Sequence, residues 1–212
     1  MSFHDRAEAG TRLADEVAGL ELPDPVVLGL PRGGVPVARE VAAALGAPLD
    51  VLVARKVGAP FQPEFGIGAV AEGGAVVIDD ETVRMIELTP PDLEGLVAKE
   101  AAEVARRVAA YRGNREPVAV AGRSVVVVDD GLATGVTADA ALRAVRARAP
   151  ARLVFAVPVG ATQSFPRILA VADDLVCIEP HDDLNSVGQW YVDFRPTTDD
   201  EVMEVLAAAA RP

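Results

Sequence analysis

Several residue types are scarce in this sequence of 212 residues, and each scarcity narrows what the protein can be. Cys177 is the only cysteine, so an intrachain disulfide is excluded and a reducing cytoplasm is expected. It lies in a short apolar run, which favours a buried core residue over a nucleophile. His4 and His181 are the only histidines, too few for a zinc-like ligand cluster. No apolar run reaches the ~20 residues of a membrane span, and the polar start is not typical of a signal peptide.

Positive charge is scarce as well. The chain has 20 Lys and Arg residues against 32 Asp and Glu residues, which gives a net charge of −12. The basic surface that binds nucleic acid is therefore absent, and no nucleic-acid partner is expected. An anionic substrate would need cations gathered at its site, or a divalent metal ion. Because 50% of the residues are hydrophobic, a single domain over residues 1–212 can bury a sizeable core.

The most informative stretch is residues 125–137, with the sequence VVVVDDGLATGVT. Four consecutive valines predict a strand that is buried on both faces, as in the middle of a parallel sheet. Asp129 and Asp130 end the strand, and a short loop leads into a helix predicted from about Ala138. In open parallel sheets, ligands bind beyond the carboxyl ends of the strands. The two aspartates and the loop are therefore expected at a binding edge.

The residue types of this stretch suit a sugar phosphate. Gly131 and Gly135 let the backbone approach a ligand closely. The unpaired amides at a helix start attract phosphate, and the hydroxyls of Thr134 and Thr137 can add donors. Ionised aspartates only accept hydrogen bonds, so they suit the neighbouring hydroxyls of a ribose. Acceptors for a diol beside a phosphate cradle describe a site for ribose 5-phosphate.

The stretch resembles the signature with which type I phosphoribosyltransferases bind phosphoribosyl pyrophosphate (PRPP). The resemblance implies an α/β fold with a mostly parallel central sheet flanked by helices, a core over about 22–180, and a hood over about 1–21 and 181–212. It implies Mg²⁺-dependent transfer of ribose 5-phosphate from PRPP to a nitrogenous base, as in nucleotide salvage, with release of pyrophosphate. Asp129 and Asp130 are expected to bind the metal through water, and a homodimer is expected. The residues expected at the ribose and the 5-phosphate are Asp129, Asp130, Gly131, Ala133, Thr134, Gly135, Val136 and Thr137.

A second glycine loop lies between a predicted strand at 26–30 and a predicted helix at 37–45. Gly33 and Gly34 expose amides to an anion, and Arg32 offers a planar fork of donors. Taken alone, Arg-Gly-Gly is an ordinary turn between a strand and a helix. Together with the downstream signature it predicts a pyrophosphate site. Members of the family hold pyrophosphate on such a loop, often through a cis peptide.

Arg55 and Lys56 follow a predicted strand at 50–54, so they are expected to face the ligand edge. The resemblance implies a mobile loop in this region, and residues 58–66 have the glycine and proline content of such a lid. Both cations are candidates for neutralising the departing pyrophosphate, which makes them candidate catalytic residues beside the two aspartates. The alternative is a solvated surface pair.

Residues 66–71 fit the pattern G-x-G-x-x-A of a dinucleotide-binding loop, which would indicate a nicotinamide-dependent oxidoreductase. The context argues against this reading, because no hydrophobic strand precedes the pattern and no helix follows it. A hairpin at the edge of the sheet is expected instead, with strands at 66–71 and 75–78. The other expected elements are helices at 3–20, 88–111, 138–147, 164–172 and 199–209, and strands at 152–159 and 175–178.

The acceptor of the transfer is left open by the sequence. Aromatic residues make up only 4% of the chain, yet Trp190 and Tyr191 lie together in the expected hood. They could stack on a base, or they could cap the core or a dimer contact. Enzymes of 6-oxopurine salvage carry an acidic residue at the position of Ala133, so the sequence disfavours hypoxanthine or guanine transfer. The chief alternative function is a PRPP or nucleotide sensor that uses the same fold without transferase activity.

Overall fold

The centre of the molecule is a parallel β-sheet. Its five strands lie in the order β2-β1-β6-β7-β8, and every neighbouring pair is parallel. The α/β fold predicted from the sequence is confirmed. This computed structural model describes residues 2–209, apart from the side chain of Glu64. The strands are β1 (Pro25–Gly29), β2 (Leu49–Val51), β6 (Ser124–Val128), β7 (Arg152–Ala161) and β8 (Asp174–His181).

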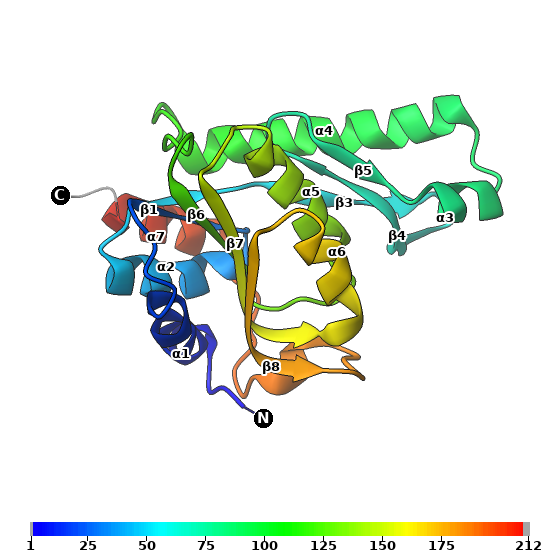
Figure 1. Cartoon of the computed structure of the whole chain (residues 1–212). Coiled ribbons are helices and arrows are strands. Elements are labelled where there is room, and N and C mark those ends of the chain that lie inside the picture. The colour runs from blue at the N-terminus through cyan, green and yellow to red at the C-terminus, as the bar shows by residue number, and fades with distance from the viewer. Residues whose placement is uncertain (1, 210–212) are drawn as a thin grey trace.

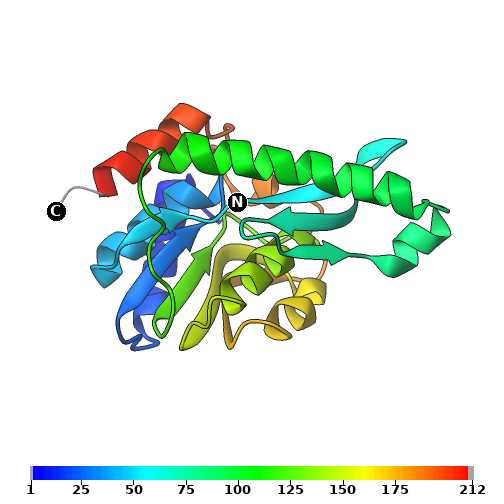
Figure 2. The same ribbon diagram turned by 90° about the horizontal axis from the view of Figure 1, so that it is seen from above.

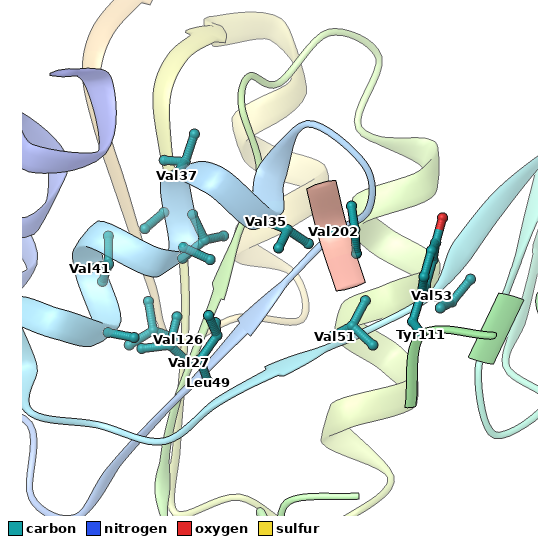
Figure 3. Close-up of a cluster of buried hydrophobic side chains, with 14 of the residues drawn as sticks. Val27, Val35, Val37, Val41, Leu49, Val51, Val53, Tyr111, Val126 and Val202 are labelled. Atoms are coloured by element: carbon teal, nitrogen blue, oxygen red, sulfur yellow. The ribbon is translucent and has the colours of Figure 1, made fainter. Parts of the chain in front are cut away.

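Helices cover both faces of this sheet (Figure 1). Val126 and Val128 of β6 pack into the cluster formed with α1, α2 and α7, whereas Val125 and Val127 pack into the cluster formed with α5 and α6. This alternation is the period of two expected of a strand that is buried on both faces. Figure 3 shows Val126 and its neighbours below α2. The helices are α1 (Arg6–Ala18), α2 (Gly34–Leu45), α5 (Val136–Arg146), α6 (Phe165–Leu169) and α7 (Asp199–Ala209).

A second, antiparallel sheet has three strands in the order β3-β4-β5. A long helix, α4, lies along it and extends away from the central sheet (Figure 2). The strands are β3 (Ala54–Ala59), β4 (Gln62–Ala71) and β5 (Val76–Ile78), and the helices that follow are α3 (Asp80–Met85) and α4 (Pro90–Arg112). Two short 3-10 helices, η1 (Thr162–Ser164) and η2 (Val187–Trp190), complete the described elements.

Two sequence-based expectations about this region are corrected. The strand predicted at 50–54 ends at Val51, and Arg55 and Lys56 lie inside β3 rather than at the end of a strand. The cause is the antiparallel ladder, in which Arg55 pairs with Val70 and Lys56 pairs with Ala69, so the extended backbone continues past both cations. The predicted hairpin exists, but it belongs to this separate sheet and not to the edge of the central one.

Helix boundaries follow local capping. Helix α1 begins at Arg6, because the Asp5 side chain accepts hydrogen bonds from the amides of Ala7 and Glu8, both at 2.9 Å. The helix predicted over 164–172 is shorter than expected and ends at Leu169. Within residues 2–209, no helix is both long and apolar enough to cross a membrane. The predicted division into core and hood stays a prediction.

Candidate active site

The two glycine-containing loops leave the central sheet side by side. Strands β1 and β6 are parallel neighbours, and Gly29 pairs with Val128 at their carboxyl ends. The amide of Leu30 then donates to the carbonyl of Val128 at 2.8 Å. The loop after β1 carries Arg32, and the loop after β6 carries the acidic pair. The register of the sheet therefore brings both candidate loops to one edge, where the sequence predicted them.

These loops are in direct contact. A β-carbon added to Gly34 would lie 2.8 Å from the Cα of Asp129, closer than real contacts allow. A β-carbon added to Gly33 would lie 1.8 Å from Oδ2 of Asp130. Only glycine fits at these two positions while the acidic loop keeps its place. The peptide bond between Pro31 and Arg32 is cis, as the family resemblance implied.

The loop from Ala133 to Thr137 leads into helix α5. Gly135 caps the helix with a left-handed φ of 75°, a conformation that favours glycine. The hydroxyl of Ser164 in η1 donates to the carbonyl of Ala133 at 2.5 Å, which connects the loop to η1. Within residues 2–209, the amides of Ala133, Thr134 and Gly135 donate to no other group. The amides of the first helical turn also lack helical partners, so the loop can receive an anion.

Burial makes ionisation of both aspartates of the acidic pair unfavourable. Burial raises the pKa of the Asp129 carboxyl well above its ordinary value, and the nearby charge of Asp130 adds to the rise. Burial also raises the pKa of Asp130, while the guanidinium of Arg6 opposes that rise. The Asp130 amide donates to Oδ1 of Asp129 at 2.8 Å. Such a pair gains from a ligand that donates hydrogen bonds or brings positive charge.

Arg6 is a site residue that the sequence reasoning missed. Its Nε atom donates to Oδ2 of Asp130 at 2.8 Å, and the two side chains are only 12% and 16% exposed. The partners are 124 positions apart in the sequence. Arg6 stands at the start of an amphipathic helix, where an arginine has no distinguishing pattern around it. No signal in the sequence could have indicated this contact.

The hood candidates separate in the structure. The ring of Tyr191 is 2% exposed and packs between Phe3 and Phe194, with ring centroids 5.5 Å and 4.9 Å away. Its burial is incompatible with stacking on a base, and the alternative, that it caps the core, is correct. Trp190 stacks on His181 with centroids 3.6 Å apart. The His181 side chain is 25% exposed, and this contact covers part of its ring.

The candidate cations lie in different places. Arg32 is half exposed, with Nη1 4.0 Å from a carboxylate oxygen of Asp199 at the start of α7. Arg55 donates through Nε to Oε2 of Glu100 on α4 at 2.5 Å. Its guanidinium is therefore engaged by α4 and not by the acidic loop. Lys56 follows it in β3, and residues 58–66 form the tip of the β3–β4 hairpin. The roles of both cations and of the lid stay predictions.

The carboxylates of Asp129 and Asp130 suit a metal ion whose other ligands come mainly from the substrate. In the part of the chain that the structure describes, no group of three or more His, Cys, Asp or Glu side chains could hold a metal ion alone. Asp129 and Asp130 offer hard carboxylate oxygens. Mg²⁺ is commonly held by one or two carboxylates together with phosphate oxygens of a substrate, so the residues present fit Mg²⁺.

Comparisons with known proteins identify the family of this chain. The model of the phosphoribosyl transferase domain family matches residues 4–195. Two curated proteins of Mycobacterium tuberculosis, from strains CDC 1551 and H37Rv and named provisionally as phosphoribosyl transferases, are each 46% identical over 209 residues. The match covers 99% of this chain and 47% of the relatives, so the chain spans about half of their length.

Solved structures are also similar to this chain. The crystal structure of TT1426 from Thermus thermophilus is 44% identical and aligns over the whole of both chains with a TM-score of 0.84. AQ2163 from Aquifex aeolicus, 15% identical, shares the fold with a TM-score of 0.51 over 96% of this chain and 84% of its own. The fold and the paired loops define a phosphoribosyltransferase-type protein. The chain belongs to the phosphoribosyl transferase domain family.

Proposed function

We propose that the protein transfers ribose 5-phosphate from PRPP to a nitrogenous base and releases pyrophosphate. The contact between Gly33 and Gly34 and the acidic pair carries this proposal, because it joins a candidate pyrophosphate loop to a candidate ribose site. In PRPP, pyrophosphate and the ribose hydroxyls sit on neighbouring carbons of one ring. A site for both must therefore bring the two loops within one ligand's width.

The ribose phosphate is assigned to the loop after β6. Asp129 and Asp130 accept hydrogen bonds from the ribose hydroxyls, directly or through water on the metal. The amides of residues 133–137 and the hydroxyls of Thr134 and Thr137 hold the 5-phosphate at the positive end of α5. Mg²⁺, when bound with PRPP beside the aspartates, supplies charge that offsets the pyrophosphate.

The leaving group is assigned to the loop after β1. The amide of Gly33 and the fork of Arg32 bind pyrophosphate. The amide of Gly34, which the sequence predicted to face the anion, donates instead to the carbonyl of Leu30 at 2.9 Å, so Gly34 contributes through its close approach to the acidic pair. The bond from ribose C1 to the pyrophosphate oxygen breaks with its electron pair, and a lone pair of the acceptor nitrogen forms the new bond to C1. The acceptor nitrogen gives up its proton to water or to the departing pyrophosphate, and no covalent enzyme intermediate is needed. Positioning and charge stabilisation supply the catalysis, with Arg55 and Lys56 retained as candidates for neutralising the leaving group.

The acceptor is not assigned to one base. Ala133 is exposed at the loop and offers no carboxylate to a purine proton, which disfavours 6-oxopurines. Trp190 is retained as the candidate for contact with the base. The proposal includes a homodimer in the cytoplasm, with PRPP and a small nitrogenous acceptor as the ligands and no nucleic acid.

Calorimetry with PRPP and Mg²⁺ tests the proposal at the acidic pair. The double variant Asp129→Asn, Asp130→Asn is expected to lose PRPP binding, because amides accept hydrogen bonds less strongly and bring no charge to the metal. The matched control is Asp173→Asn, Asp174→Asn. It changes two adjacent aspartates at the opposite, amino end of β8, and it is expected to bind PRPP as the wild type does. Unchanged affinity in the first variant would overturn the assignment.

A screen of bases with PRPP and Mg²⁺, in which the released pyrophosphate is measured, tests the reaction itself. Release with one acceptor establishes transfer. If the protein binds PRPP tightly but no base causes pyrophosphate release, the alternative function, a PRPP or nucleotide sensor, is favoured. A gel-shift assay with nucleic acid, with and without PRPP, then tests whether the sensor acts on transcription.

A further inference from the structure

Asp130 is held at both its side chain and its backbone by two residues that are far apart in the sequence, Arg6 and Tyr191. Arg6 donates from Nε to its carboxylate at 2.8 Å. The hydroxyl of Tyr191 donates to its carbonyl oxygen at 2.7 Å. The neighbouring Asp129 has neither contact, so the structure singles out the second aspartate.

Arg6 is itself fixed in place. Its Nη1 atom donates to the carbonyl of Arg195 at 2.8 Å, and its guanidinium carbon lies 4.0 Å from the centroid of the Phe194 ring. A hydrogen-bonded, stacked arginine with little exposure has few alternative rotamers. We call Arg6, Tyr191 and Phe194 the terminal clamp.

The segments that carry the clamp pair with each other. Phe3 and Tyr191 form a parallel β-bridge, and the amide of Asp193 donates to the carbonyl of His4 at 2.7 Å. These bonds bring the residues just before α1 beside the segment that follows η2. The clamp therefore depends on the pairing of residues 3–6 with residues 191–194 at the carboxyl edge of the sheet.

The clamp reaches the boundary between the two loops of the site. The position that a β-carbon of Gly33 would take is 1.8 Å from Oδ2 of Asp130 and 3.1 Å from Nε of Arg6. The ion pair thus lies against the glycine loop assigned to pyrophosphate. A carboxylate beside Asp129 would turn away from that like charge if nothing held it. Arg6 instead keeps it where the ribose hydroxyls and the glycine loop meet.

We propose that Arg6 is a positioning residue of the ribose subsite, which acts through Asp130 and is supported by Phe194 and Tyr191. The proposal rests on the proposed function, because it assigns a role within the PRPP site. The physical gain is preorganisation, since a carboxylate already oriented by a charge-assisted hydrogen bond loses less freedom when ligand binds. The proposed role acts on the carboxylate that binds the ribose hydroxyls, so binding of ribose 5-phosphate and binding of pyrophosphate test it separately.

Calorimetry with three probes, each with Mg²⁺, tests the proposal: PRPP, ribose 5-phosphate and inorganic pyrophosphate. Arg6→Gln is expected to lower the affinities for PRPP and ribose 5-phosphate about tenfold or more, because a hydrogen bond to a charged group is lost. Pyrophosphate affinity is expected to stay at the wild-type value. Arg6→Lys is expected to recover part of the loss, and Tyr191→Phe, which removes only a hydroxyl, to cause a smaller loss of the same pattern.

Arg12→Gln is the matched control. Arg12 lies on the same helix, its guanidinium carbon lies 4.6 Å from the centroid of the Phe3 ring, and Nη1 donates to the carbonyl of Ser2 at 2.8 Å. Like Arg6, it stacks on an aromatic ring and donates to a backbone carbonyl, but it does not touch the acidic loop. Wild-type affinity for all three probes is expected in this variant.

Three outcomes overturn the proposal while PRPP binding by the wild type stands. They are unchanged PRPP affinity in Arg6→Gln, an equal loss in Arg6→Gln and Arg12→Gln, and a parallel loss of pyrophosphate affinity. If Arg6→Gln fails to fold, as thermal unfolding would show, Arg6→Lys and Tyr191→Phe decide the question. A wild type that binds neither PRPP nor ribose 5-phosphate overturns the proposed function, and this inference with it.

Discussion

At the scale of single residues, the ionised carboxylate of Asp129 lowers the stability of the folded state because it is buried in the site. Its folded-state pKa is raised above the ordinary value of 3.8 by burial and by Asp130. A raised carboxyl pKa means that the folded state disfavours the ionised form. The penalty is absent below about pH 3.8 and grows as pH rises through the folded-state pKa. The side chain that should bind ligand is therefore one that the fold tolerates at a cost.

Asp129→Asn is accordingly expected to raise the melting temperature at neutral pH, even though it removes a ligand group. Each kcal/mol of relief corresponds to a shift of about 2–4 °C in a chain of this size. The gain should shrink as the pH falls toward 3.8, where the wild-type carboxyl is protonated as well. Thermal scans over a pH series provide the measurement.

Asp130→Asn makes the contrasting variant. It also removes a buried charge, but it leaves the guanidinium of Arg6 without its partner, so no gain is expected. If Asp129→Asn were destabilised at neutral pH, the raised pKa would be the wrong account of this pair.

At the scale of elements, the glycine loop after β1 sets how closely two strand ends can approach. A β-carbon on Gly34 would meet the carbonyl oxygen of Val128 at 2.6 Å and the Cα of Asp129 at 2.8 Å. Both are backbone atoms, which cannot turn aside as a side chain can. Gly34→Ala is therefore expected to move one loop away from the other and to cost about 1–3 kcal/mol of stability. Pyrophosphate and PRPP affinities should both fall.

Gly95→Ala is the control for Gly34→Ala, and its effect on stability is expected to have the opposite sign. It lies in α4, and a β-carbon there would meet no atom within 4 Å. Gly95→Ala should stabilise the protein by about 0.5–1 kcal/mol and leave ligand affinity unchanged. Urea unfolding and calorimetry of the two variants measure both effects. Equal behaviour of the two alanines would show that the close approach at Gly34 is unimportant.

The same scale shows what the sequence could predict. The valine run of β6 and the loops that follow β6 and β1 carry their signals locally, so strand, acidic pair and glycine loop were all predicted. Burial raises the pKa of Cys177 to about 12, but its side chain is half-buried against the core rather than fully buried as the sequence predicted. Arg55 was misplaced because its strand is set by pairing with β4, a partner that the local pattern does not name. Arg6 was missed because its ion pair joins two distant segments.

At the scale of the whole molecule, one arginine ties the two sheets together. Arg112, at the end of α4, is 8% exposed. Its Nε lies 3.2 Å from Oδ2 of Asp50 in β2 of the central sheet, and its Nη1 lies 2.7 Å from Oε1 of Glu72, beyond the end of β4 in the second sheet. Its Nη2 also donates to the carbonyl of Val51 at 2.9 Å. Helix α4 and the end of β4 are anchored to the central sheet through this network.

Arg112→Met should destabilise the chain by about 3–5 kcal/mol, because it leaves Asp50 and Glu72 without the charge that offsets their burial. That loss is large beside a typical total stability of about 5–15 kcal/mol. Combining it with Asp50→Asn and Glu72→Gln removes the uncompensated charges, so the triple variant should regain much of the loss. Urea unfolding of the three proteins, wild type, single and triple, tests the account. A triple variant no more stable than Arg112→Met would mean that Arg112 joins the sheets through its packing rather than through its charge.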